Sequence, residues 1–178
     1  MTYFESLKDA KGITDVFMER KDKYLPALVL AQEFLREESY LLAKDRELIA
    51  AYTSKLNGCK YCCSSHVTFA VSCGITEDEI TLVVTNENVS EHPLGPILAY
   101  VRKLTLDPSS LTQEDADAVL NDGFTENELK DAIAVCALFN FYNRIVEGHG
   151  IEQGTAEDHK DSADIINEIG YDGRYFSK

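Results

Sequence analysis

The sequence predicts an all-α protein, because helix start signals recur along the chain and only one short segment would permit a strand. Capping boxes of the Thr-x-x-Glu type follow stop glycines at residues 76–79 and 125–128, and two further Thr-x-x-acid starts occur at Thr112 and Thr155. In a capping box, the Thr hydroxyl and the acidic side chain pair with backbone N–H groups that the first helical turn leaves unsatisfied. Four such starts in 178 residues leave little room for a sheet.

The first helices are expected before residue 36. A short helix should lie near residues 14–20, in an otherwise polar segment that carries no recognisable chemistry. Residues 25–35 are mostly apolar and predict a longer helix with Pro26 in its first turn, where a missing N–H does no harm.

An antiparallel helix pair is expected on both sides of Gly58. Apolar residues recur at helical spacing over residues 45–57, and a glycine after a helix is the usual left-handed cap. The chain should turn at Gly58, begin a second helix at or near Cys59 and continue it to Cys73, where Gly74 ends it.

The second half of the chain also reads as helices and turns. Residues 82–85 are β-branched enough to permit a strand, but we expect the end of a short helix there. Further helices are expected over residues 93–106, over 125–148 as a central buried helix, and over 155–170 as an amphipathic helix. The aromatic tail 171–178 should pack on the body of the protein or on another subunit.

Length and charge restrict the possible classes of protein. The length suits one domain, which we place at residues 1–178. The formal net charge of −14 and the lack of a Lys/Arg tract disfavour nucleic-acid binding. The amino terminus lacks a signal-peptide pattern, and no apolar run has the length of a membrane span. We therefore expect a soluble cytoplasmic protein that does not insert into membranes.

The helix pair carries the motif E-x11-C-x2-C-x3-H, which consists of Glu47, Cys59, Cys62 and His66. At about 1.5 Å of rise per residue, Glu47 and His66 both lie about 12–16 Å from Gly58, so their side chains should meet. The two cysteines and His66 are spaced i, i+3 and i+7, which places them on one helix face. Taken singly, Glu47 and His66 are ordinary helix residues, and only the set indicates a site.

A carboxylate, an imidazole and two thiols in a row can generate a reactive thiolate. The carboxylate orients the imidazole and raises its basicity, and the imidazole takes a proton from a thiol. The helix N-terminus favours a thiolate at Cys59, whereas His66 reaches Cys62, four residues before it. We follow the second argument and predict that Cys62 reacts first.

The motif resembles the active-site pattern of the alkylhydroperoxidase D (AhpD) branch of the carboxymuconolactone decarboxylase superfamily. Its members look like compact all-helical thiol peroxidases. The apolar helix through residues 139–146 is similar to one that packs behind the motif in peroxidase-related members. The resemblance implies an AhpD-like fold, a proton relay through Glu47 and His66, a Cys62 that reacts with peroxide and a disulfide between Cys62 and Cys59. It also implies a homo-oligomer, either a trimer or a hexamer.

Two departures from the family pattern affect these expectations. Lys60 and Tyr61 stand between the cysteines, whereas the best-known branch has a further histidine just before the second cysteine. Any relay here would therefore run through His66 alone. Cys63 directly follows Cys62 and could compete in disulfide formation, so its role stays open.

The other cysteines and histidines have structural explanations. Zinc prefers a closed tetrahedral set of ligands, and one helix that presents Cys59, Cys62, Cys63 and His66 cannot easily close around an ion, so we expect no metal and no bound cofactor. Cys73 and Cys136, which lie among apolar residues, are expected in the core. The remaining histidines are His92 in a loop, His149 at a helix end and His159 on a charged helix. Tyr61, Asn143 and Arg144 could line the site or serve in packing.

These observations favour a thiol-dependent peroxidase of the alkyl hydroperoxide reductase type. Its substrate would be a small hydroperoxide, and an external dithiol or a redox partner protein would restore the thiols. Two alternatives are a non-catalytic redox sensor or disulfide carrier, and a lactone decarboxylase. The cysteine pair argues against the decarboxylase, because that branch of the superfamily looks to work without one.

Overall fold

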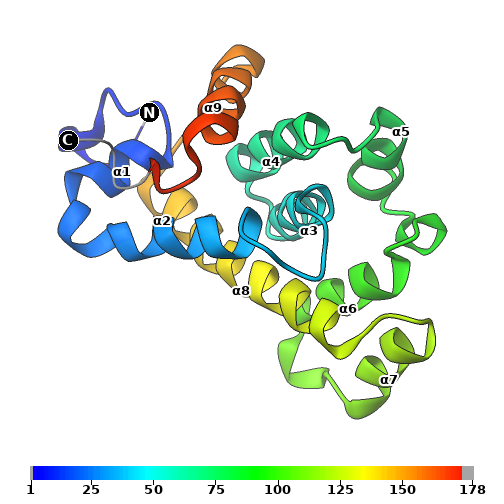
Figure 1. Cartoon of the computed structure of the whole chain (residues 1–178). Coiled ribbons are helices and arrows are strands. Elements are labelled where there is room, and N and C mark those ends of the chain that lie inside the picture. The colour runs from blue at the N-terminus through cyan, green and yellow to red at the C-terminus, as the bar shows by residue number, and fades with distance from the viewer. Residues whose placement is uncertain (1, 174–178) are drawn as a thin grey trace.

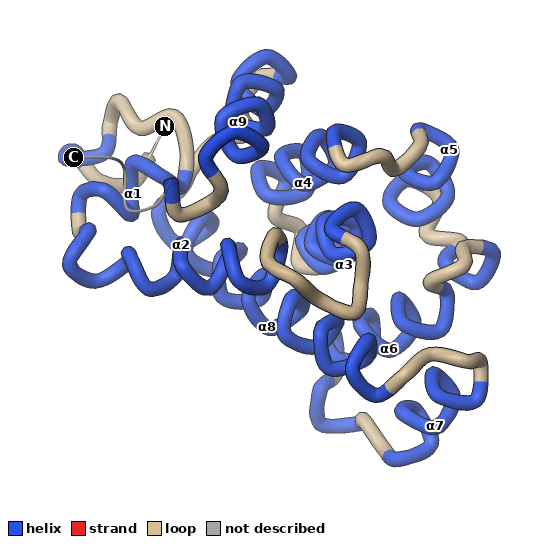
Figure 2. The backbone as a smooth tube through the Cα atoms, viewed as in Figure 1, coloured by secondary structure: helices blue, strands red, loops and turns tan. Residues whose placement is uncertain are grey.

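Residues 2–173, the part of the chain that the computed structural model describes, form nine α-helices and no strand (Figure 2). The predicted all-α fold is confirmed. The helices are α1 (Ile13–Glu19), α2 (Lys21–Leu35), α3 (Ala43–Leu56), α4 (Lys60–Ser72), α5 (Glu77–Ile80), α6 (Gly95–Leu106), α7 (Gln113–Asn121), α8 (Glu126–His149) and α9 (Ala156–Ile169).

Helix α3 lies at the centre of the fold. Figure 1 shows it nearly end-on, and it contacts α2, α4, α6 and α8. Nine consecutive α3 residues, Arg46–Ser54, are buried, so this helix is enclosed on all its faces. Polar side chains on α3 therefore need partners within the protein. Helix α9 packs on α4, and α7 lies against α6 and α8.

The predicted antiparallel pair is formed by α3 and α4, which pack closely together. Gly58 has a left-handed backbone with φ of 74°, and its N–H donates to the Lys55 carbonyl. Cys59 is the N-cap of α4, where its backbone is extended. The three-residue connection 57–59 thus brings the two faces that carry the motif against each other.

The four predicted capping starts are all present. Thr76, Thr112, Thr125 and Thr155 are the N-caps of α5, α7, α8 and α9, and each backbone N–H donates to the acidic side chain three residues later. The distances lie between 2.7 and 2.9 Å. These four helix starts are therefore encoded locally.

One detail differs from the sequence prediction. Helix α2 begins at Lys21, so Pro26 lies inside the helix and not in its first turn. The non-helical backbone of Arg20, with φ of −126° and ψ of 52°, separates α1 from α2, so that α2 starts early. Residues Thr81–Thr85, for which the end of a short helix was predicted in preference to a strand, continue α5 as a π-helical turn.

Most buried apolar side chains of the described residues form one hydrophobic cluster that includes the inner faces of α2, α3, α6 and α8. None of the helices within residues 2–173 is long and apolar enough to cross a lipid bilayer.

Replacement of Gly58 tests the turn that sets the α3–α4 pair. Gly58→Ala should lower the free energy of unfolding by about 1–2 kcal/mol, because an L-residue is strained at φ of 74° although no atom lies within 4 Å of the added Cβ. The control is Gly148→Ala within α8, where space is also open and helix propensity should stabilise the protein by about 0.5–1 kcal/mol. Urea unfolding measures both, and equal effects of the two changes would contradict the role of the turn.

Candidate active site

Glu47 and His66 are in direct contact, as the motif spacing predicts. His66 Nδ1 lies 2.6 Å from Glu47 Oε2, with Glu47 fully buried on α3 and His66 only 6% exposed on α4. An ionised carboxylate can only accept a hydrogen bond, so Nδ1–H donates, and Nε2 is the ring nitrogen that can exchange a proton with a molecule in the site. The contact thus selects which ring nitrogen is left to act as a base.

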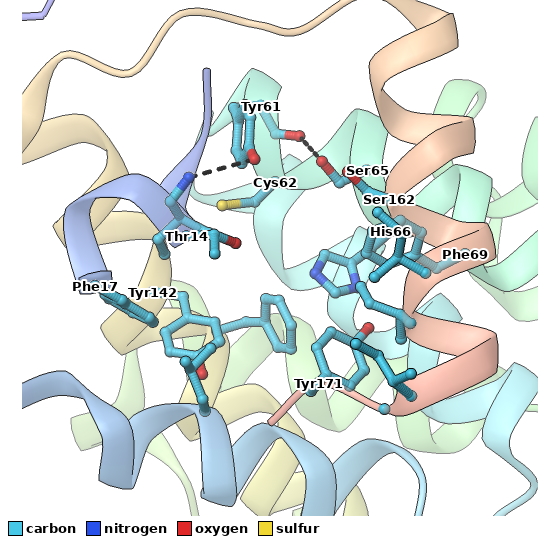
Figure 3. Close-up of a pocket in the computed structure, with 17 residues that line it drawn as sticks. Thr14, Phe17, Tyr61, Cys62, Ser65, His66, Phe69, Tyr142, Ser162 and Tyr171 are labelled. Atoms are coloured by element: carbon cyan, nitrogen blue, oxygen red, sulfur yellow. Dashed lines mark hydrogen bonds between the residues drawn. The ribbon is translucent and has the colours of Figure 1, made fainter. Parts of the chain in front are cut away.

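Three aromatic rings hold the imidazole of His66 in place. Phe139 and Phe69 present their edges to it, with centroid distances of 4.3 and 5.0 Å, and the Tyr171 ring lies nearly parallel to it at 6.3 Å. Figure 3 shows one His66 ring nitrogen turned toward the open space on the side of Cys62. Because Nδ1 is bonded to Glu47, this nitrogen is Nε2.

Cys62 and His66 line one cavity with a volume of ≈ 380 Å³ (Figure 3). Its walls come from α1, α2, α4, α8 and α9 and are mostly apolar. The apolar side chains include Phe17, Leu28, Phe139, Ile166 and Ile169. Thr14, Tyr61, Ser65 and Ser162 add hydroxyl groups. A small molecule with an apolar body and a polar end would suit this space.

The two cysteines of the motif differ in access. Cys59 is fully buried and does not line the cavity, whereas Cys62 lines it with 4% of its surface exposed. The hydrogen bond with Cys59, together with burial, raises the pKa of the Cys62 thiol well above its ordinary value, while the Asn143 amide acts in the opposite direction. Among the described residues no hydrogen bond joins the Cys62 thiol to His66, so a proton would have to cross the cavity between them.

Cys63 lies outside the cavity and is half-buried. Burial raises its pKa to about 11, against a smaller opposing effect of Lys55. It is the most exposed thiol of the three, yet it is not placed to meet a molecule beside Cys62.

Glu47 has two further partners that the sequence analysis did not single out. The Arg36 guanidinium bonds Glu47 Oε1, and the Tyr171 hydroxyl donates to the same oxygen at 2.6 Å. Burial acts to raise the pKa of Glu47, but His66, Arg36 and the Tyr171 hydroxyl together hold it below its ordinary value of 4.5. Glu47 is therefore a buried carboxylate with three donors on its two oxygens.

Signals for these two residues in the sequence are weak. Arg36 is one arginine in a charged segment after α2 and has no spacing relation to the motif. Tyr171 belongs to the aromatic tail for which packing was predicted, and it does pack on the body of the protein. Residues 174–178 of that tail lie outside the described part of the chain.

One prediction about a single side chain is wrong: Cys73 is half-buried at the end of α4 and does not belong to the core. His159 lies on the charged helix α9, as predicted, but it is only 4% exposed and its Nδ1 lies 3.0 Å from Ser65 Oγ. Cys136 is buried as predicted.

Of the residues that could line the site or serve in packing, Tyr61 lines the cavity. The buried Asn143 bonds Ser54 on α3 and acts on the Cys62 thiol. Arg144 is exposed, donates to Asn140 and does not line the cavity.

The sequence model described as the carboxymuconolactone decarboxylase family matches residues 23–89, a range that contains all four motif residues. The predicted resemblance to this superfamily is confirmed over that range. The comparison with curated proteins found no match. The matched range ends before α6, so the family comparison does not cover α8, α9 or Tyr171.

Solved AhpD-like structures share the fold over most of the chain. A peroxidase-related protein from Ralstonia eutropha JMP134, described as an alkylhydroperoxidase AhpD core, is 20% identical with a TM-score of 0.73 and covers 88% of this chain and 84% of its own. A peroxidase-related protein from Silicibacter sp. TM1040 is 22% identical with a TM-score of 0.72 and covers 88% and 85%. A protein of unknown function from Agrobacterium tumefaciens, described as an AhpD antioxidant defence protein, is 19% identical with a TM-score of 0.54 and covers 87% and 99%.

Replacement of Glu47 tests the buried charge. Glu47→Gln should lower the free energy of unfolding at neutral pH by about 3 kcal/mol, because it leaves Arg36 buried without its counter-charge. The folded protein holds the pKa of Glu47 below 4.5, so the carboxylate stabilises the fold above pH 4.5 and does so less as the pH falls further. The difference in the free energy of unfolding between wild type and Glu47→Gln should therefore become smaller below pH 4.5. Urea unfolding at several pH values measures this difference, and a difference that does not change with pH would contradict a buried, ionised Glu47.

Proposed function

We propose that this protein is a thiol-dependent peroxidase that reduces an organic hydroperoxide with Cys62 and Cys59. The observation that carries the proposal is that Cys62 and His66 line one cavity while Glu47 holds the far nitrogen of His66 at 2.6 Å. A nucleophile, a base and an orienting acid are the parts that activate a thiol. The AhpD-like fold and the peroxidase-related descriptions of two structural neighbours support the same chemistry.

Cys62 is the thiol that attacks, since it is the one of the pair that a molecule in the cavity can touch. Its raised pKa means that the thiol needs a base. His66 Nε2 takes the proton across the cavity, through a water molecule or the substrate hydroxyl. The Cys62 thiolate then attacks the terminal oxygen of the hydroperoxide, the O–O bond breaks, and the leaving alkoxide takes the proton back from His66 to become an alcohol.

Cys59 completes the cycle. Its hydrogen bond to Cys62 places its sulfur next to the sulfenic acid, so a Cys59–Cys62 disulfide forms and water leaves. Because Cys59 is fully buried, an external dithiol must attack the disulfide at the Cys62 sulfur, from the cavity. The net reaction converts a hydroperoxide and a dithiol to an alcohol, water and a disulfide.

Separate serine variants test the two roles. After one equivalent of cumene hydroperoxide, Cys59→Ser should keep a sulfenic acid on Cys62 that dimedone traps, whereas Cys62→Ser should form none on Cys59. Cys73→Ser, outside the cavity, is the control and should retain turnover. Mass spectrometry locates the adduct, and sulfenic acid on Cys59 in the Cys62→Ser variant would reverse the assignment. Oxidation of the wild type without turnover in the presence of a dithiol would indicate a redox sensor.

The apolar cavity predicts a preference for bulky substrates. With saturating dithiol, kcat/KM should be at least about tenfold higher for cumene hydroperoxide than for hydrogen peroxide, because the phenyl and methyl groups bury apolar surface in the cavity. Ile166→Asn, which places an amide on the wall, should reduce this ratio. An equal or higher kcat/KM for hydrogen peroxide in the wild type would contradict the role of the cavity.

A further inference from the structure

We propose that Arg36 and Tyr171 are positioning residues that act through Glu47, holding its carboxylate so that Oε2 stays on His66 Nδ1. Arg36 does not line the cavity, so it cannot touch a substrate there. Tyr171 lines the cavity with its ring, but its hydroxyl is committed to Glu47. The catalytic consequence rests on the peroxidase function proposed above.

The first argument is the number of donors on one carboxylate. Arg36 and the Tyr171 hydroxyl both bond Oε1, which leaves Oε2 to His66 Nδ1 at 2.6 Å. A carboxylate bonded through one oxygen alone can rotate about its last torsion, which is broad in side chains of this type. Two donors on Oε1 from different directions remove that freedom and fix the position of Oε2.

The second argument is that the two positioning residues also brace each other. The Arg36 guanidinium carbon lies 4.9 Å from the centroid of the Tyr171 ring, within cation–π range. The same ring lies nearly parallel to the His66 imidazole, with an interplanar angle of 14°. Arg36, Tyr171 and His66 thus form a stack, and each of the three also bonds the Glu47 carboxylate.

The third argument is that the Tyr171 backbone is itself anchored. Tyr171 N–H donates to Gln32 Oε1 at 2.9 Å, and Gln32 is a buried polar residue on α2. Gly170 lies so close to the Gln32 amide that an added Cβ would be 2.5 Å from its oxygen. Tyr171 is therefore held against α2 at a defined position. This anchoring keeps its hydroxyl within reach of Glu47 Oε1.

The fourth argument is chemical. Burial and the neighbouring Glu47 raise the pKa of Tyr171 well above its ordinary value, so its hydroxyl stays protonated and remains a donor. Arg36 keeps its charge at any physiological pH. Both residues can therefore hold Glu47 throughout a cycle in which His66 gains and loses a proton.

The test compares Tyr171→Phe and Arg36→Gln with the control Tyr52→Phe. Tyr171→Phe keeps the ring and its stacking and removes only the hydroxyl group that donates to Glu47. Tyr52 is also a buried tyrosine, and it lies on α3 like Glu47, but its hydroxyl bonds Arg102 and it does not line the cavity. Arg36→Lys is the conservative variant, which keeps a cation near Oε1.

The first measurement is the solvent exchange of the His66 Nδ1–H proton by NMR on protein labelled with ¹⁵N-histidine. The chain has four histidines, so His→Gln changes at the other three assign the signal. Exchange should be slow in the wild type and about tenfold faster in Tyr171→Phe and Arg36→Gln, because a carboxylate that rotates releases Nδ1–H more often. It should be unchanged in Tyr52→Phe and partly restored in Arg36→Lys. Unchanged exchange in both Tyr171→Phe and Arg36→Gln would overturn the proposal.

The second measurement is steady-state hydroperoxide reduction. Tyr171→Phe should lower kcat about tenfold and leave KM within about twofold, and it should have no further effect in the Glu47→Gln background. Additive losses in the double variant would show that Tyr171 does not act through Glu47 and would overturn the proposal. The NMR measurement needs no turnover, so an inactive wild type would refute the proposed peroxidase function while the positioning role is still tested.

Discussion

A carboxylate enclosed by protein is the constraint around which this site is built. Glu47 is fully buried in the middle of α3, and an ionised carboxylate at such a depth is tolerated only with donors on both oxygens. The donors come from three other segments: Arg36 after α2, His66 on α4 and Tyr171 after α9. The need to satisfy one charge therefore fixes where four parts of the chain meet.

The motif and its helix pair could be predicted because the interactions that form them are local. A left-handed glycine and one short turn separate α3 from α4, so the rise of a helix is enough to place Glu47 beside His66. The capping starts depend on residues three positions apart, which the sequence displays directly. The same reasoning failed at Pro26, because the break at Arg20 that starts α2 early carries no recognised signal.

The rest of the site depends on contacts between segments that lie far apart in the sequence. Arg36 and Tyr171 meet at Glu47 only because α2 and α9 both end beside the α3–α4 pair, and no periodicity in either helix reports this. The position of His159 has a related origin. Its charged neighbours on α9 give no sign of burial, but packing against α4 turns this side chain toward Ser65.

Cys59 and Cys62 differ in their access to the cavity, and under the proposed function this difference separates their roles. The cavity touches Cys62 and not Cys59, so a hydroperoxide and a reductant would have to use the same entrance and the same sulfur at different stages. Under the proposed function, the apolar walls would hold the substrate body while water stays scarce around the sulfenic acid, and Cys59 would condense with it from the buried side. The disulfide would also form in preference to further oxidation, because a second hydroperoxide must replace the alcohol in the cavity before it can reach Cys62, whereas the Cys59 thiol already lies beside the Cys62 sulfur. The burial that raises the pKa of Cys62 and makes a base necessary is thus the same burial that would protect the oxidised sulfur.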